Sequence, residues 1–313
     1  MHKDQQQNLG SLYLFLAFSL AGSSVVAGKY LTGSLGVFTI SAISLSLATL
    51  TLLPALAGQI RGICARLTGR AWLLLLCQAL CGIFLFRLFM LVGLQKTSAA
   101  EAGILTGATP AISAILARLA LREKVRPLQI AGIACTIVGI AGIQSEWPTL
   151  ADILYGQASH LAGNLLVLLA AASESSFNVL ARWDHLRTSS TAQPSIGPAA
   201  STAIVSAIAG LLCVPFAISE RPLAHLASLP AAGWGALAWY GIVVTGIAFI
   251  FFYAGIRRQS AYAAAAFSGM IPLAAMVLAA VLLREPTLPR QWLGGGLVIA
   301  GILLLAAKCV IIS

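Results

Sequence analysis

Long apolar runs separated by short polar segments dominate this chain of 313 residues. Each run is close to the roughly 20 residues that an α-helix needs to cross a bilayer. The pattern therefore predicts an all-α integral membrane protein with ten transmembrane helices. Their expected ranges are Leu9–Ala27, Leu35–Ala57, Ala71–Leu94, Thr97–Ala117, Pro127–Ile143, Ala162–Ala181, Pro198–Ile218, Gly233–Gly255, Ser260–Leu283 and Pro289–Ala307.

The composition excludes most other classes of protein. Hydrophobic residues make up 59% of the chain and charged residues only 9%, and the mean hydropathy is +0.93. Soluble domains carry roughly 25% charged residues, so this chain has too few charges to cover a soluble globule. We therefore expect the lipid bilayer as its surroundings, and neither a cytosolic enzyme nor a secreted domain.

The basic residues indicate an orientation rather than a nucleic-acid partner. The formal net charge is +10, and most Lys and Arg residues lie between the apolar runs. With the N-terminus inside, inner segments hold thirteen of them and outer segments five. Because cytoplasmic loops carry the excess of positive charge, we expect a multi-pass protein of the cell (inner) membrane with both termini cytoplasmic.

The chain also repeats itself at a shift of 162 positions. The odd number of helices per copy predicts two inverted five-helix repeats, 9–143 and 160–307, joined by a loop at 144–159. Secondary transporters share this architecture and bind substrate near the membrane midplane. The matches are Pro110 with Pro272, Arg122-Glu123 with Arg284-Glu285, Gln129 with Gln291, Gly132 with Gly294, and Gly139 with Gly301.

In these residues the sequence resembles the drug/metabolite transporter superfamily, in its ten-helix EamA type. The pattern is a Pro-bearing helix, then Leu-Arg-Glu, then Gln-x-x-Gly, and it occurs twice. The resemblance implies two five-helix bundles around a central cavity and the export of amino acids, other metabolites, toxic compounds or metallophores. Members usually carry Trp in helices 1 and 6, where alignment here places Ala21 and Glu174. The resemblance then implies a wider and more polar cavity.

Glu174 is the strongest candidate for a substrate- or proton-binding residue. It lies about 18 Å into helix 6, near the middle of a ~30 Å core. Asn178 is one turn further, Ser175 is adjacent, and Ser23 and Ser24 occupy the corresponding stretch of helix 1. The alternative is a structural Glu that is hydrogen-bonded between helices.

Arg87 and Glu101 are the other two charges within predicted spans. Each such charge costs about 2.5–3.5 kcal/mol at the centre of a helix, so each needs a reason. Antiparallel neighbouring helices would bring both to similar depth, and the matching positions Phe249 and Ala263 lack both charges. We predict that Arg87 and Glu101 neutralise each other; the alternative is that either contacts the substrate directly.

Pro110 and Pro272 are predicted inside helices 4 and 9, as hinges for alternating access or as static kinks. The repeated glycines Gly132, Gly139, Gly294 and Gly301 predict close helix packing.

No catalytic constellation, phosphate loop or metal cluster is visible, and none of the six cysteines forms a CxxC pair. We therefore expect no enzyme, no cofactor and no metal, and a monomer suffices. The predicted function is a secondary transporter that exports a small polar or zwitterionic metabolite by alternating access. Proton coupling and facilitated diffusion are both compatible with the sequence. The alternatives are an exporter of a larger opine-type metallophore, a non-transporting receptor or scaffold, and, least favoured, an intramembrane enzyme.

Overall fold

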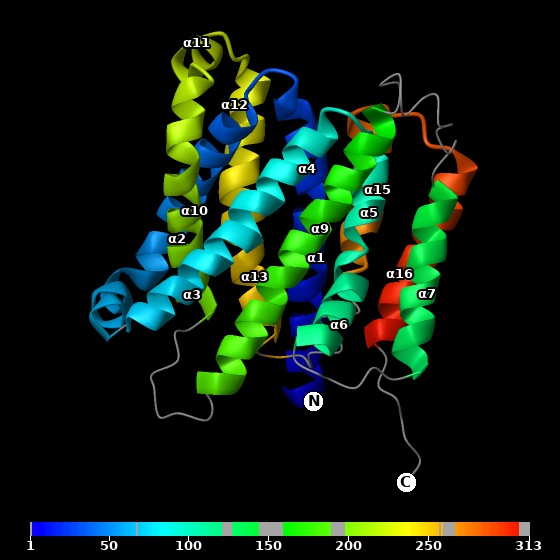
Figure 1. The fold of residues 1–313 in the computed structure, drawn as a ribbon, viewed down its shortest axis with the longest axis horizontal. Coiled ribbons are helices and arrows are strands. Elements are labelled where there is room, and N and C mark those ends of the chain that lie inside the picture. The colour runs from blue at the N-terminus through cyan, green and yellow to red at the C-terminus, as the bar shows by residue number, and fades with distance from the viewer. Residues whose placement is uncertain are drawn as a thin grey trace.

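The computed structural model describes residues 2–66, 68–120, 127–143, 159–188, 198–256, 258 and 267–306, and within these ranges every regular element is a helix. Among the described residues, six helical stretches are long and apolar enough to cross a membrane, and four further apolar helices are shorter. Figure 1 shows them lying side by side as one bundle. The protein is therefore a multi-pass helical membrane protein. The predicted connection at 144–158 and the loop with Arg122-Glu123 lie outside the described residues.

Six of the predicted helices form as continuous elements. Helix α7 has the predicted ends, and its first residue is a proline, which lacks the N–H that a helix start leaves unpaired. Helices α1 and α9 extend beyond their apolar runs into polar sequence. The bounds are α1 His2–Thr32, α2 Val37–Arg66, α7 Pro127–Ile143, α9 Ser159–Thr188, α10 Pro198–Ser219 and α16 Pro289–Ala306.

Two of the predicted helices contain a π-helical segment. The first consists of α3 (Gly69–Ala79), η1 (Leu80–Leu85) and α4 (Phe86–Leu94), and the second of α12 (Ala231–Ala238), η2 (Trp239–Ile247) and α13 (Ala248–Ile256). A short helix, α11 (Pro222–Ala227), precedes α12. Such π-helical turns are rare and concentrate at functional sites, and the apolar pattern did not indicate them.

The prolines with a predicted hinge role stand at helix starts, which corrects their placement inside helices. The predicted fourth helix is broken at Gly107 and Ala108 into α5 (Ala99–Thr106) and α6 (Thr109–Ala120), so Pro110 lies in the first turn of α6. Pro272 lies in the first turn of α15 (Met270–Leu282). A proline there removes no helical hydrogen bond. The hinge role remains a prediction.

Glycines allow the closest pairing of helices in the bundle, that of α7 with α16. A Cβ atom on Gly132 would lie 2.8 Å from the carbonyl oxygen of Gly301, and one on Gly139 would lie 2.7 Å from that of Gly294. Both distances are shorter than a carbon atom tolerates. The predicted close packing is confirmed, because only glycine lets these backbones approach so far.

Most other long contacts join one half of the chain to the other. Helix α1 packs along α13 and α15, while α9 packs along α4, α5 and α6. Helix α2 pairs with α10, and α5 pairs with α15.

The main hydrophobic core lies toward the distal end, by which we mean the end opposite to the start of α1, where the turn between α4 and α5 lies (Figure 1). Its buried residues include Val25 and Leu31 near the end of α1, Ile40 near the start of α2, Leu94 at the end of α4 and Ile104 in α5. The helices are thus packed tightly at this end.

The outer surface of the bundle is apolar. Leu119, Leu211 and Leu293 are more than 70% exposed although they lie within helices. Such side chains suit contact with lipid rather than water.

Candidate functional site

The structure separates the three predicted intramembrane charges into three different environments. Arg87 lies in α4, Glu174 in α9 and Glu101 in α5.

Arg87 is a buried cation held by neutral groups. Its side chain is only 6% exposed. The guanidinium donates to Ser44 Oγ at 2.6 Å and to Thr245 Oγ1 at 2.9 Å, and it lies 4.4 Å from the ring centroid of Tyr240. Thr245 and Tyr240 both belong to η2, and η1 ends directly before α4. The guanidinium therefore contacts η2, and its own residue lies in the first turn of α4, directly after η1.

The predicted ion pair between Arg87 and Glu101 is wrong. No described carboxylate lies within ion-pair distance of Arg87, and Glu101 bonds to a different set of side chains. The reason is direction: Arg87 extends toward α2 and η2, while Glu101 extends toward α9 and α16. Similar depth along neighbouring helices did not decide which way the side chains point.

Glu174 is half-buried and bonds to the break between α5 and α6. The Thr109 hydroxyl donates to Glu174 Oε2 at 3.0 Å, and the adjacent, fully buried Ser175 donates to the Thr109 carbonyl at 2.9 Å. Thr109 is the first residue of α6, and the positive end of a helix dipole favours a carboxylate. Of the described cationic side chains, none is within ion-pair distance of Glu174. Asn178, one turn further, is exposed and does not bond to it.

Arg87 and Glu174 lie at similar depth on the packed pair α4 and α9. The level of the pair is fixed by Gly82, on which a Cβ would collide with the Phe177 side chain. From this point Arg87 lies five residues toward the distal end, about 7.5 Å, and Glu174 three residues, about 4.5 Å. Two opposite charges, neither with a described ionic partner, thus occupy neighbouring helices at nearly one level.

Of the two serines predicted at the site in α1, Ser23 bonds to an aromatic residue of η2. Ser23 is buried, donates to the Leu20 carbonyl at 2.6 Å and accepts a hydrogen bond from Trp239 Nε1 at 2.9 Å. Ser24 is half-buried on the same helix. The indole of Trp239 in η2 therefore lies against the part of α1 where Ala21 stands in place of the Trp that is usual in relatives.

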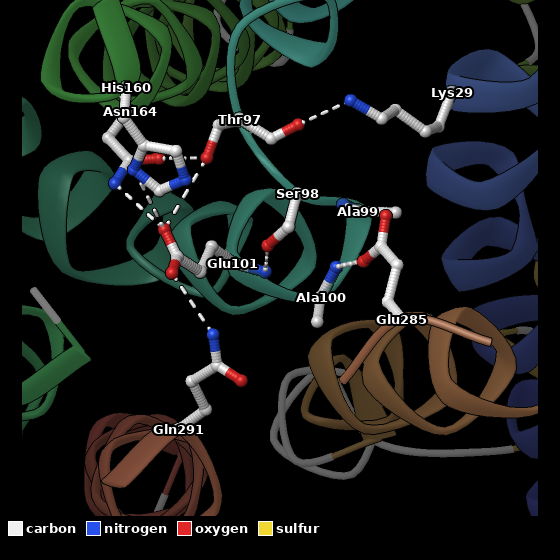
Figure 2. Close-up of polar contacts among 10 residues, drawn as sticks. All are labelled: Lys29, Thr97, Ser98, Ala99, Ala100, Glu101, His160, Asn164, Glu285 and Gln291. Atoms are coloured by element: carbon white, nitrogen blue, oxygen red, sulfur yellow. Dashed lines mark hydrogen bonds and ion pairs between the residues drawn. The ribbon is translucent and has the colours of Figure 1, made fainter. Parts of the chain in front are cut away.

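Glu101 is the centre of a polar cluster at the distal end (Figure 2). We call Thr97, Glu101, His160, Asn164 and Gln291 the Glu101 cluster. The carboxylate is 5% exposed and accepts from Gln291 Nε2 and from Asn164 Nδ2, each at 3.0 Å. The imidazole Nδ1 of His160 lies 3.6 Å from Glu101 Oε2. One carboxylate thus joins α5, α9 and α16.

Each amide group in the cluster has a second contact beyond Glu101. Gln291 Oε1 accepts from the backbone N–H of Leu288 at 3.0 Å, and Asn164 Oδ1 accepts from the Thr97 hydroxyl. Each amide turns its NH₂ group toward Glu101. In this geometry both oxygens of the Glu101 carboxylate act as hydrogen-bond acceptors.

The surroundings of the Glu101 cluster bind the turn between α4 and α5 to other helices (Figure 2). Lys29 of α1 donates to the carbonyls of Leu94 and Thr97 at 2.6 and 2.7 Å. Glu285 accepts from the backbone N–H groups of Ala99 and Ala100 at 3.0 Å each, and so caps α5. A pocket of about 410 Å³ opens here, lined by residues that include Lys29, Lys96, Glu101, His160 and Glu285.

Sequence reasoning missed the roles of Gln291, Glu285 and Glu220. Gln291 and Glu285 stand in the repeated motifs, so their repetition was a signal, but it did not name their partners. Glu220 caps α2 by accepting from the N–H groups of Phe38 and Thr39 at 3.1 and 2.8 Å. Arg221 and Arg284, which adjoin the two capping carboxylates, have left-handed φ angles of 53° and 52°. Ordinary residues adopt this conformation rarely, so both turns are held by their surroundings.

The fold and these buried polar sites define a multi-pass membrane transporter. The family model of the EamA-like transporter family matches residues 8–145 and 161–307. The chain belongs to this family, within the drug/metabolite transporter superfamily.

Similar proteins carry transporter names. An uncharacterized transporter, YetK of Bacillus subtilis, is 31% identical over 295 residues, which cover 94% of this chain and 86% of YetK. A probable terminal-alkyne amino-acid exporter of Streptantibioticus cattleyicolor is 27% identical over 237 residues, or 72% of this chain and 71% of the exporter. One crystal structure with 19% sequence identity shares the fold at a TM-score of 0.61, covering 94% of this chain and 97% of that one.

Proposed function

We propose that the protein exports a small zwitterionic metabolite across the cytoplasmic membrane by alternating access. The observation that carries the proposal is the pair of opposite charges, buried Arg87 and half-buried Glu174, at nearly one level of the bundle. A charge in a membrane interior is costly and marks a substrate or ion pathway. A substrate with a carboxylate and an amine would replace the present hydroxyl contacts of both residues by ion pairs.

The proposed architecture is two inverted five-helix repeats with the substrate between them. The contacts between the halves support this. The first helix of the first half, α1, packs on α13 and α15 of the second half, and the first helix of the second half, α9, packs on α4, α5 and α6 of the first half. The pairs α2 with α10, α5 with α15 and α7 with α16 each join corresponding helices. The two family matches, one in each half, agree with this division.

The proposed orientation places the chain termini in the cytoplasm and the distal end outside. The ratio of thirteen to five basic residues supports it. The main core then closes the outer end, so substrate would reach Arg87 and Glu174 from the cytoplasm first.

Glu174 is the proposed site at which a proton can compete with the amine of the substrate. Proton and amine would each neutralise the same carboxylate, which is the simplest route to exchange. Facilitated diffusion needs no such competition and predicts transport that does not depend on a proton gradient.

The test begins with metabolite profiles of cells with and without the gene, since a compound retained only in the deletion strain identifies the substrate. Glu174→Gln keeps the shape and removes the charge, so it should restore export only weakly and with a flattened pH dependence. Glu220→Gln is the matched control, because this carboxylate caps the start of α2 and is not one of the proposed substrate contacts. Full export by Glu174→Gln with the wild-type pH profile would make the carboxylate structural.

The same profiles test the substrate class. Retention of a compound with one amine and one carboxylate supports the proposal. Retention of an uncharged compound, or of no compound at all, contradicts it. Glu174→Trp restores the aromatic residue usual in relatives and should change which compounds pass.

A further inference from the structure

We propose that the Glu101 cluster closes a gate at the distal end of the transporter, and that His160 makes this closure depend on protons at that side. The proposal rests on the proposed function, because a gate presupposes a pathway. It concerns residues separate from the central pair Arg87 and Glu174.

Glu101 joins three helices through hydrogen bonds that must break before the distal end can open. Its two oxygens accept from Gln291 of α16 and Asn164 of α9, while its own backbone belongs to α5. The backbone N–H of Leu288 fixes Gln291 as a donor to Glu101, and the Thr97 hydroxyl bonds to Asn164 Oδ1. Hydrogen bonds to a charged acceptor are about twice as strong as neutral ones, and these are buried.

Two further elements at this end, α1 and the connection between α15 and α16, bond to the turn between α4 and α5. Lys29 attaches α1 to the carbonyls of Leu94 and Thr97, and Glu285 attaches the connection between α15 and α16 to the first turn of α5. The main core packs directly around these contacts. A pathway cannot open here while the polar contacts persist.

The two halves of the chain differ at the position of Glu101. A shift of 162 residues places Ala263 opposite Glu101, so the second half has no carboxylate at the corresponding position. The residues of that region lie outside the described ranges, and the comparison is one of sequence alone. The Glu101 cluster therefore favours closure at one end rather than at both.

His160 supplies the dependence on protons. Its side chain is 51% exposed and lines the pocket, so it is accessible to the solution at the distal end. The charged groups around the pocket are Lys29 from α1, Lys96 from the turn before α5, Glu101 from α5 and Glu285 from the turn before α16. Histidine changes its charge between pH 5 and 8. A protonated His160 adds a cation 3.6 Å from the Glu101 carboxylate and so strengthens the closed state.

The experiment measures the opening directly and needs no substrate. Spin labels are attached at Leu165→Cys in α9 and Leu293→Cys in α16, both exposed and close to Asn164 and Gln291, in a cysteine-free protein in lipid nanodiscs. Double electron–electron resonance then gives the distribution of distances between the labels. We expect one dominant short distance in the wild type.

Glu101→Gln should raise the ratio of long to short distances about tenfold, because one fixed amide donor then faces an N–H group. The double variant Glu101→Gln with Gln291→Glu swaps the two side chains and again gives every donor an acceptor. It should restore the wild-type distribution of distances. Glu220→Gln removes a distal-end carboxylate that joins α2 to α10, outside the cluster, and should change nothing. A Glu101→Gln distribution equal to that of the wild type overturns the gate.

The pH arm tests His160 separately. In the wild type the long-distance fraction should fall as the pH is lowered from 8 to 6, and His160→Ala should abolish this change. Equal pH responses of the two proteins overturn the role of His160. Because the labels report on shape, a gate that opens as expected in a protein that exports no metabolite would refute the proposed function alone.

Discussion

Removal of the Arg87 charge should cost less stability than removal of the small hydroxyl that accepts from it. Arg87→Met takes away both the guanidinium and its cost of burial. The hydroxyls of Ser44 and Thr245 remain satisfied, because they donate to the carbonyls of Ile40 and Tyr240 at 2.6 and 2.9 Å. No buried donor loses its partner in this variant.

The magnitudes follow from the contacts. Two hydrogen bonds from a charged donor contribute about 1.5–3 kcal/mol each, and the contact with Tyr240 adds about 0.5–2 kcal/mol. Burial of an ion without an ionic partner costs several kcal/mol, which offsets most of this gain. We therefore expect the free energy of unfolding of Arg87→Met to stay within about 1.5 kcal/mol of the wild type. Ser44→Ala leaves a buried guanidinium N–H unpaired and should cost about 1–3 kcal/mol.

The assay is thermal unfolding of the purified protein, followed by tryptophan fluorescence, together with export by the same variants. Arg87→Met should remain stable and lose export of an anionic or zwitterionic substrate. In the Arg87→Met background, Ser44→Ala should have almost no further effect, because the donor that needs Ser44 is absent. If Arg87→Met is less stable than Ser44→Ala, the guanidinium is a structural residue and the reasoning fails.

Three further predictions concern packing, capping and topology. Gly139→Ala should lower the free energy of unfolding by about 1–3 kcal/mol because its Cβ meets the Gly294 carbonyl, whereas Gly142→Ala on the same helix has open space and should be neutral; equal melting temperatures would contradict this. Glu285→Gln should cost about 0.5–2 kcal/mol in thermal unfolding, since it weakens the cap of α5, and an unchanged transition would show that the cap contributes nothing. In intact cells an impermeant thiol reagent should label Arg290→Cys but not Arg70→Cys on a cysteine-free background, and the opposite pattern would reverse the orientation.

The sequence alone predicted the six continuous helices because a bilayer imposes a simple rule. Each span must be apolar over its length and must satisfy its own backbone, so a run such as Pro127–Ile143 predicts its helix almost to the residue. The glycine pairs were readable for a similar reason, since small residues two turns apart on one face serve close packing. These features depend on neighbours along the chain.

The irregular backbone was not readable in the same way. The break at Gly107 and Ala108 and the π-helical segments η1 and η2 lie within apolar sequence that also fits a continuous helix. Packing across the bundle decided them, because Thr245 of η2 and Arg87, the second residue of α4 after η1, have to meet. The hydropathy of a segment does not depend on which distant residue it must contact.

The partners of the charged residues were decided by tertiary structure alone. The sequence identified Arg87, Glu101 and Glu174 as intramembrane charges that need compensation, and the structure provides hydrogen-bond partners for each of them. It then paired the first two by depth, whereas Glu101 bonds to Gln291, which is 190 residues away, and Arg87 bonds to Thr245, which is 158 residues away. Burial depth depends on position along one helix, but a hydrogen bond depends on the direction of a side chain and on which distant helix lies there.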